Sequence, residues 1–318
     1  MRFSLKLCII IILIILLPIN VQAETSKYQA GKLVDEYMLK NEISTPYGPY
    51  EYKGNEYFVV KLIPQNQVGL IKTQFVIDKT KGEIVLDQDV YYGVSKIDLY
   101  LNDIAANDYL TMYNDNTISI REDISYWGDS QKFWDETADI ATTTDEKNAA
   151  EEATSICGEL VVKFESELEV SQNLIDAIND ILEDTPSDVE IDNYINLKTQ
   201  LNSDYKDSQK AVIEASDSFP PIYDKFTDSN YAYGLLKSDW ESYKNTDLSE
   251  LGNLDDNYKV LITSGQIDPW IQDNIDWSWE SMNDRVASGS NILASLPGFG
   301  VSGSVVALLL LTLLFKKK

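Results

Sequence analysis

Residues 158–184 read GELVVKFESELEVSQNLIDAINDILED. Their apolar side chains return every three or four residues, which places them on one face of an α-helix, and acids occupy the other face. The stripe consists of Leu160, Val161, Phe164, Leu168, Ile175, Ile178, Ile181 and Leu182. This pattern predicts a long amphipathic helix that buries one face against other helices.

Comparable helical stretches fill the region from residue 94 to residue 292. Pro186-Ser187-Asp188 ends the quoted helix and offers a cap to the next one, and SFPPIYDKF (218–226) predicts another break. A final helix is expected to carry Trp270, Ile271, Ile275, Met282 and Val286 on its apolar face. Because short connections make consecutive helices antiparallel neighbours, we expect an acidic helical bundle over 94–292.

The region 24–93 shows a different pattern. Residues 27–40 have helical spacing, and STPYGPY (44–50) predicts a turn after them. Strand-like runs follow at 56–63, 70–78 and 83–87, and a hairpin turn over 79–82 has Gly82 available for a positive φ. The fold class is therefore predicted as mainly α: an antiparallel helical bundle preceded by a small α+β unit, a helix with a three-stranded antiparallel meander.

That small unit resembles a known module. A helix followed by a meander that ends in VIDKTKGEIV (76–85) is similar to the half-repeat of PepSY-type modules of secreted proteins. The resemblance implies a role in binding or inhibition rather than catalysis.

Charge and residue inventory exclude several functions. The chain has 26 Lys+Arg against 52 Asp+Glu, which gives a formal net charge of −26. The negative electrostatic potential of such a chain repels nucleic acid phosphates, so no nucleic acid partner is expected. It contains no histidine, which removes Ser-His-Asp and Cys-His hydrolases. Acidic pairs such as Glu151-Glu152 and Asp255-Asp256 would serve a glycosidase only if two carboxylates faced each other across a cleft. We therefore expect a non-enzymatic protein and name no catalytic residue, cofactor-binding residue or metal ligand.

Cysteine and tryptophan positions lead to further expectations. Cys8 falls in the N-terminal apolar run, so Cys157 is alone in the remaining chain, where a buried and inert thiol is expected. Trp127 and Trp134 are seven residues apart, as are Trp270 and Trp277, and this spacing favours core positions. Trp279 is expected to be the exposed one. The alternative is an interfacial belt or a carbohydrate platform built from the C-terminal tryptophans.

The first 23 residues have the pattern of a secretory signal. Arg2 and Lys6 precede an apolar run over 7–17, and Ala23 is the last small residue before Glu24, where we expect cleavage. An uncleaved anchor is less favoured, because Pro18 closes the apolar run short of the roughly 20 residues that span a bilayer. The sequence thus predicts export.

The segment 293–318 combines three features in order. Pro297-Gly298-Phe299 precedes a nearly continuous apolar run over 301–315, and three lysines (316–318) close the chain. The run is short of the roughly 20 residues of a typical spanning helix, and the lysines favour a cytoplasmic end. On these physical grounds, we expect the tail to stop in the membrane during export, with the folded part of the chain outside the cell.

Together these features resemble the tripartite sorting signal of archaeal surface proteins that are substrates of archaeosortase. The resemblance implies that an archaeosortase-like membrane enzyme processes the chain at Pro297, Gly298 and Phe299 and replaces the tail with a lipid anchor. The alternative is a plain transmembrane anchor that is retained. The lead-in ASGSNILASL (287–296) is short, so the folded body is expected close to the membrane.

The sequence therefore predicts an exported protein anchored at the extracellular face of the cell membrane, with a structural role in the envelope or an unknown extracellular partner. Two alternatives stay open: a single-pass, membrane-tethered ectodomain that senses a ligand, and a carboxylate-dependent hydrolase.

Overall fold

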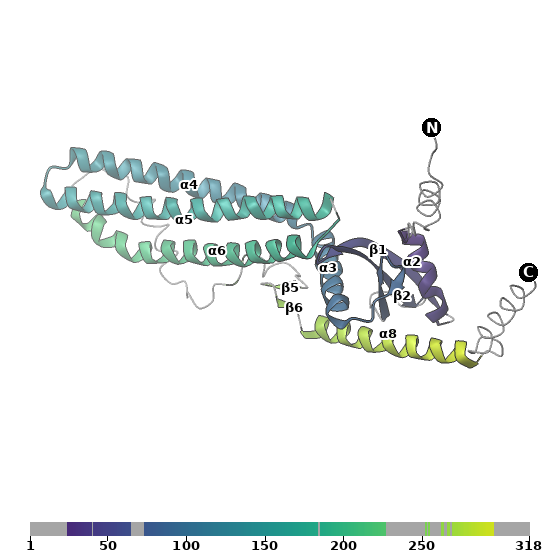
Figure 1. Cartoon of the computed structure of the whole chain (residues 1–318). Helices are drawn as coiled ribbons and strands as arrows, with labels where there is room; N and C mark the ends of the chain where they lie inside the picture. The colour runs from purple at the N-terminus through teal and green to yellow at the C-terminus, as the bar shows by residue number, and fades with distance from the viewer. Residues whose placement is uncertain are drawn as a thin grey trace, which may run out of the picture. The chain divides into compact units, whose positions relative to one another are not determined.

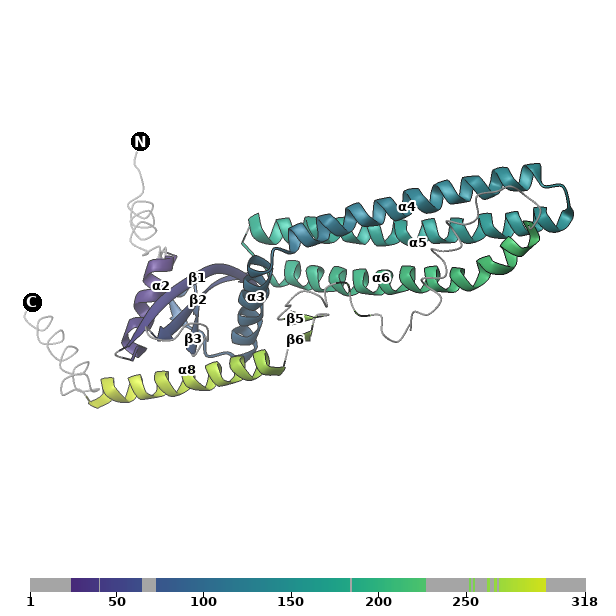
Figure 2. The same ribbon diagram turned by 180° about the vertical axis from the view of Figure 1, so that it is seen from behind.

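The computed structural model describes most of the chain between residues 24 and 295, in two compact units (Figure 1, Figure 2). The described residues are 24–39, 41–64, 73–183, 185–226, 252, 254, 262–263, 266–267 and 269–295. The first unit holds the described residues up to Pro49, Gly54–Tyr91 and the described residues from Trp277 on; the second holds Tyr50–Lys53 and Tyr92–Asp276. The predicted fold class, a helical bundle preceded by a small α+β unit, is confirmed.

The first unit is built on a four-stranded antiparallel sheet with the strand order β1-β2-β3-β4. Its elements are α2 (Lys27–Val34), η1 (Asp35–Tyr37), β1 (Glu42–Tyr52), β2 (Asn55–Pro64), β3 (Thr73–Asp78) and β4 (Glu83–Ile84). Ser26 caps α2 in a capping box with Gln29, which satisfies free N–H groups of the first turn. All of β3 and most of β2 are buried, so both faces of the central strands are covered.

The strand β1 corrects one prediction. STPYGPY was expected to be a turn, but it lies inside β1, at the edge of the sheet. Prolines are tolerated on an edge strand because the outward-facing residues need no N–H for a ladder, so Pro46 and Pro49 do not end the strand. The preceding helix is also shorter than the predicted 27–40, since α2 ends at Val34 and passes into η1.

The hairpin between β3 and β4 agrees with the sequence. Gly82 has a φ of +66°, a conformation that favours glycine. The Asp78 carboxylate accepts hydrogen bonds from the backbone N–H of Thr80 (3.0 Å) and Lys81 (2.8 Å), which holds the turn closed.

The second unit is dominated by three long helices. Its elements, some of which begin or end in the first unit, are α3 (Gln88–Ala106), α4 (Tyr109–Ile140), α5 (Thr144–Glu183), α6 (Asp188–Tyr223), η2 (Asp224–Phe226), β5 (Ile262–Thr263) and β6 (Gln266–Ile267). Figure 1 shows α4, α5 and α6 side by side in this unit. With 40 residues, α5 is about 60 Å long at 1.5 Å per residue.

The core of the bundle lies where the apolar stripe predicted it. Leu160, Phe164, Ile178 and Ile181 are buried in α5, whereas Leu182 is exposed at its end. Trp134 of α4 packs against Phe219, Tyr223 and Phe226 with ring centroids 6.2, 5.7 and 5.7 Å away. Such aromatic contacts bury large apolar areas and contribute strongly to stability.

The predicted start of α6 is confirmed, whereas its predicted end before the two prolines is wrong. Ser187 caps the helix in a capping box with Glu190, as the Pro186-Ser187-Asp188 signal indicates. Pro220 and Pro221, however, do not end the helix before them but lie in its last turn. Proline lacks the N–H for the bond to the fourth preceding carbonyl, and the α-helix then ends at Tyr223, followed by one turn of η2.

The last helix, α8 (Pro269–Ser295), is divided between the two units. From Trp277 on it belongs to the first unit with the sheet. The Ser278 hydroxyl accepts a hydrogen bond from the Gln74 backbone N–H (2.8 Å), and the Ser281 and Thr73 hydroxyls are 2.8 Å apart. Met282 is completely buried. The bundle is thus an insertion between Tyr91 and Trp277 of a unit that continues on both sides of it.

Candidate binding site

The residues predicted for processing lie almost entirely outside the described part of the chain. Ala23, Pro297, Gly298 and Phe299 are outside it, and so are the signal segment and the apolar tail. Glu24 is described: its carboxylate is exposed and 3.2 Å from the Lys79 ammonium. Among the residues that the structure describes, no helix is both long and apolar enough to cross a membrane.

The buried and exposed tryptophans agree only in part with the prediction. Trp127 and Trp134 are buried in the bundle core, as expected. Trp277, expected in the core, is 47% exposed, whereas Trp279, expected outside, packs on Tyr91 with a ring-centroid distance of 4.9 Å. The two residues are about 200° apart around the helix, so when Trp279 faces the first unit Trp277 faces away. The side chain of Trp270 is outside the described part.

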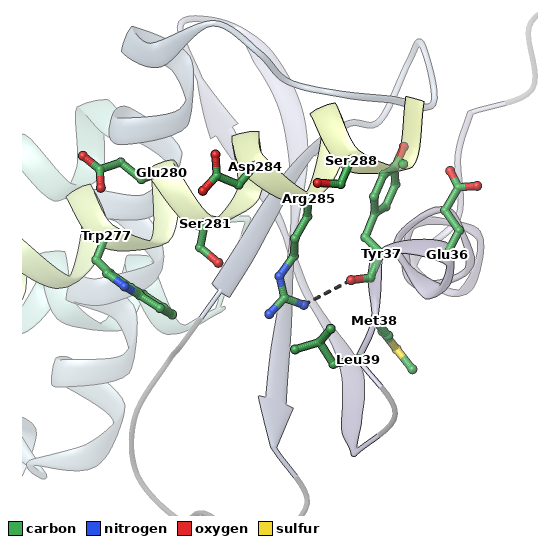
Figure 3. Close-up of a pocket in the computed structure, with 11 residues that line it drawn as sticks. Glu36, Tyr37, Met38, Leu39, Trp277, Glu280, Ser281, Asp284, Arg285 and Ser288 are labelled. Carbon is green, nitrogen blue, oxygen red and sulfur yellow. Dashed lines mark hydrogen bonds between the residues drawn. The ribbon is translucent and has the colours of Figure 1, made fainter. Parts of the chain in front are cut away.

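Exposed Trp277 lies in a hollow beside α8, called here the α8 hollow (Figure 3). Its lining residues are Glu36, Tyr37, Met38, Leu39, Trp277, Glu280, Ser281, Asp284, Arg285, Ser288 and Gly289, all of them in the first unit. The cavity measures about 490 Å³, which lies within the range of small-ligand sites. Residues 280, 281, 284 and 288 lie three, four, seven and eleven positions after Trp277, so α8 presents all five on one face.

An ion pair holds the wall of the α8 hollow in place. The Arg285 guanidinium donates to both carboxylate oxygens of Glu42, at 2.7 and 3.0 Å, and to the Tyr37 carbonyl oxygen at 3.1 Å, the bond drawn in Figure 3. The hydrogen bond from Arg285 lowers the pKa of Glu42, against the opposing effect of burial. This fork-shaped contact fixes the segment after η1 against α8.

A close approach shapes one end of the α8 hollow. A Cβ atom added at Gly289 would lie 2.8 Å from Cε1 of the Tyr37 ring, so this glycine lets helix and ring come together. Burial raises the pKa of the Tyr37 hydroxyl, and a hydrogen bond with Glu36 adds to this.

The α8 hollow combines apolar surface with negative charge. Tyr37, Met38, Leu39 and Trp277 supply the apolar part, and Leu39 is 62% exposed. The carboxylates of Glu36, Glu280 and Asp284 are exposed at its edges. Within the described part of the chain, Glu280 and Asp284 take part in no hydrogen bond or ion pair. The charge of Arg285 is already matched by Glu42, so the hollow has a net negative charge.

A second group of acids surrounds one buried glutamate of the bundle. Glu167 of α5 is 1% exposed, and its carboxylate accepts a hydrogen bond from the Ser208 hydroxyl at 2.6 Å. Burial raises the pKa of Glu167 to about 7, with smaller contributions from the charges of Asp123 on α4 and Asp204 on α6. Burial, and then the charge of Glu122, also raises the pKa of Asp123.

Neither this group nor any other in the described residues gathers three Asp, Glu, Cys or His side chains positioned to hold a metal ion. Cys157 is buried, as predicted, and burial raises the pKa of its thiol to about 12, which makes the nucleophilic thiolate rare at neutral pH.

Neither acid group was predicted from the sequence, although the spacing of residues in the sequence marks part of each. Glu167 and Ser171 occupy core positions in the alternating four- and three-residue spacing Leu160, Phe164, Glu167, Ser171, Leu174, Ile178, Ile181. Polar residues at such positions point to a buried polar contact. The face of α8 that carries Glu280 and Asp284 could likewise be read from the spacing, but its pairing with η1 could not.

Comparisons with known proteins add no relative. No family model, no curated protein and no solved structure matches the chain.

Proposed function

We propose that the chain is an exported protein, anchored at the extracellular face of the cell membrane, that acts without catalysis as an envelope component or as a binding protein for an extracellular partner. Its proposed processing partner is an archaeosortase-like membrane enzyme, and its proposed anchor is a membrane lipid attached after removal of the tail.

The observation that carries the proposal is the order of features at the C-terminus. The folded helix α8 ends at Ser295, and Pro297-Gly298-Phe299 follows after one residue, then the apolar run and the lysines. The lead-in to the motif is thus helical up to Ser295, which supports the expectation of a folded body held close to the membrane.

Chain connectivity adds support for this arrangement. The described residues nearest to both chain ends, Glu24 and Ser295, belong to the first unit. Cleavage before Glu24 and anchoring after Ser295 would therefore leave this unit intact.

The non-catalytic part of the proposal rests on the residue inventory. The chain has no histidine, and the thiol of Cys157 is buried with a raised pKa. An acidic surface with net charge −26 favours solvation and the attraction of basic partners.

Intact-mass analysis of the protein extracted from membranes tests the proposal. We expect a mass that lacks residues 1–23 and the segment after the Pro297-Gly298-Phe299 motif and that includes an added lipid. A variant with all three motif residues changed to alanine should keep the lysines. A native protein that retains Lys316–Lys318 would instead support the plain transmembrane anchor and refute lipid anchoring.

A further inference from the structure

We propose that the α8 hollow binds an arginine side chain presented by a partner polypeptide. This inference goes beyond the proposed anchoring and does not depend on it, because every residue it uses lies in the first unit.

The charge of the α8 hollow determines the sign of its ligand. Glu280 and Asp284 are four residues apart on α8, exposed and unpaired within the described part of the chain, and Glu36 lies on the η1 side. The cation in the wall, Arg285, does not oppose an incoming cation, since both of its terminal nitrogens bind Glu42. An anionic ligand would meet three carboxylates, and a cationic one is attracted by them.

The apolar surface determines the shape of the ligand. Trp277 is 47% exposed, and its indole ring can stack with a planar cation. Leu39 provides surface for the methylene stem that carries such a charge (Figure 3). Tyr37 and Met38, farther along the hollow toward Gly289, provide surface for the residues that flank it. A bare metal ion or a compact ammonium group brings no apolar surface of its own, so it would leave these apolar side chains exposed to water.

Arginine fits this combination better than lysine. Its guanidinium is planar, stacks on aromatic rings and offers several N–H donors that can reach two carboxylates together, while the lysine ammonium is a strongly hydrated point charge. At about 490 Å³ the hollow has room for one side chain and its flanking backbone.

The wall is built before any ligand arrives. The Arg285–Glu42 pair and the contact of Gly289 with Tyr37 hold η1 and α8 together in the absence of a partner. A preformed surface loses little conformational entropy on binding, which favours measurable affinity even for a single side chain.

The test uses the full chain in nonionic detergent, labelled with ¹³C at the methionine methyl groups. Met38 lines the α8 hollow, whereas Met112 and Met282 are buried elsewhere and serve as internal controls. The Met38 signal is assigned by its loss in Met38→Leu. The probe is the peptide N-acetyl-Gly-Arg-Gly-amide, titrated at physiological salt so that diffuse attraction to the acidic surface is screened.

We expect a saturable shift of the Met38 signal with a Kd on the order of 1 mM, and steady Met112 and Met282 signals. The same peptide with citrulline, a neutral isostere of arginine, should bind about tenfold more weakly. Trp277→Leu should weaken binding about fivefold, and so should Glu280→Gln combined with Asp284→Asn.

The matched control is Glu165→Gln combined with Glu169→Gln, which removes the same two charges from an exposed i, i+4 pair on α5. It should leave the affinity unchanged. The proposal is overturned if this control weakens binding as much as the α8 variant, if citrulline binds as well as arginine, or if Met38 does not respond. A Met38 shift of equal size with methyl glucoside would show a sugar platform and would also overturn it.

Discussion

At the scale of single residues, Glu167 is a buried acid whose environment disfavours its charge. It lies in the bundle core, and the Ser208 hydroxyl is its hydrogen-bond donor at 2.6 Å. An ordinary glutamate has a pKa of 4.5, whereas burial raises the pKa of Glu167 to about 7. The folded chain therefore binds more protons than the unfolded chain between these two values, and stability falls as the pH rises through this window.

The change Glu167→Gln should remove that dependence. Glutamine is neutral at every pH and can still accept the Ser208 hydrogen bond, so we expect the free energy of unfolding at pH 8 to rise by up to about 3 kcal/mol. At pH 4 the variant and the parent should differ little, because Glu167 is then protonated when folded. Urea unfolding of the full chain, followed by tryptophan fluorescence, measures both.

Glu165→Gln on the exposed face of α5 is the control and should change the free energy of unfolding by less than about 0.5 kcal/mol at either pH. A loss of stability at pH 8 in Glu167→Gln would mean that the bundle needs the ionised carboxylate, contrary to this account.

At the scale of elements, α8 is held to the first unit by an ion pair with little exposure. The Arg285 side chain is 17% exposed and that of Glu42 is 6% exposed. Removing one partner of such a pair leaves the other charge buried without compensation, which costs more than the pair itself contributes.

We therefore expect Arg285→Met to lower the free energy of unfolding by about 3 kcal/mol at pH 7. The pKa of Glu42 is lowered in the folded chain, so its stabilising contribution is present above the ordinary value and is lost as the pH falls through the folded pKa. The difference from the parent should thus shrink toward pH 3. Unfolding in urea at the two pH values provides the measurement.

Arg121→Met serves as the control, because Arg121 is exposed on α4. Its effect should stay within about 0.5 kcal/mol. Equal effects of the two substitutions would show that the Arg285–Glu42 pair does not hold α8.

Two helical glycines provide a second test at this scale. A Cβ atom at Gly93 in α3 would overlap the Tyr52 ring, whereas a Cβ atom at Gly128 in α4 would meet nothing within 4 Å. Gly93→Ala should therefore destabilise by about 2 kcal/mol through overpacking. Gly128→Ala should stabilise by up to about 1 kcal/mol, since alanine favours the helix.

Thermal unfolding of both glycine variants reports the sign of each effect. If Gly93→Ala were neutral, the Tyr52 ring would move aside at little cost, and the overpacking expected here would be wrong.

At the scale of the whole molecule, the folded helix α8 ends directly before the motif at which anchoring is proposed. The helix reaches Ser295, so a single residue separates it from Pro297. Under the proposed function, little flexible chain lies between the folded first unit and the membrane.

A flexible Gly/Ser insertion of about 20 residues between Ser295 and Leu296 should relieve this restriction, since such a linker has a root-mean-square reach of roughly 25 Å. An epitope placed at the start of the insertion should bind antibody on intact cells more strongly than the same epitope inserted alone. Flow cytometry of intact cells measures the difference. Equal labelling of the two would contradict a membrane-proximal first unit.

Local periodicity was enough to determine the long helices. Leu160, Phe164, Ile178 and Ile181 repeat at the helical period, and the buried face of α5 follows from that repeat. The cap at Ser187 and the positive φ of Gly82 are likewise properties of a few neighbouring residues. These features need no knowledge of distant parts of the chain.

The remaining features depend on contacts between segments that are far apart in the sequence. Residues 44–50 (STPYGPY) form an edge strand because β2 lies beside them. The last helix packs on the sheet because hydrogen bonds of Ser278 and Ser281 hold it there. Ser278 occupies a buried position on the face of α8 that packs on the sheet, where hydrophobic periodicity expects an apolar residue, so that periodicity assigned Trp277 and Trp279 to the wrong sides. Which face of a helix is buried depends on the partner that covers it, and here that partner is 204 residues away in the sequence.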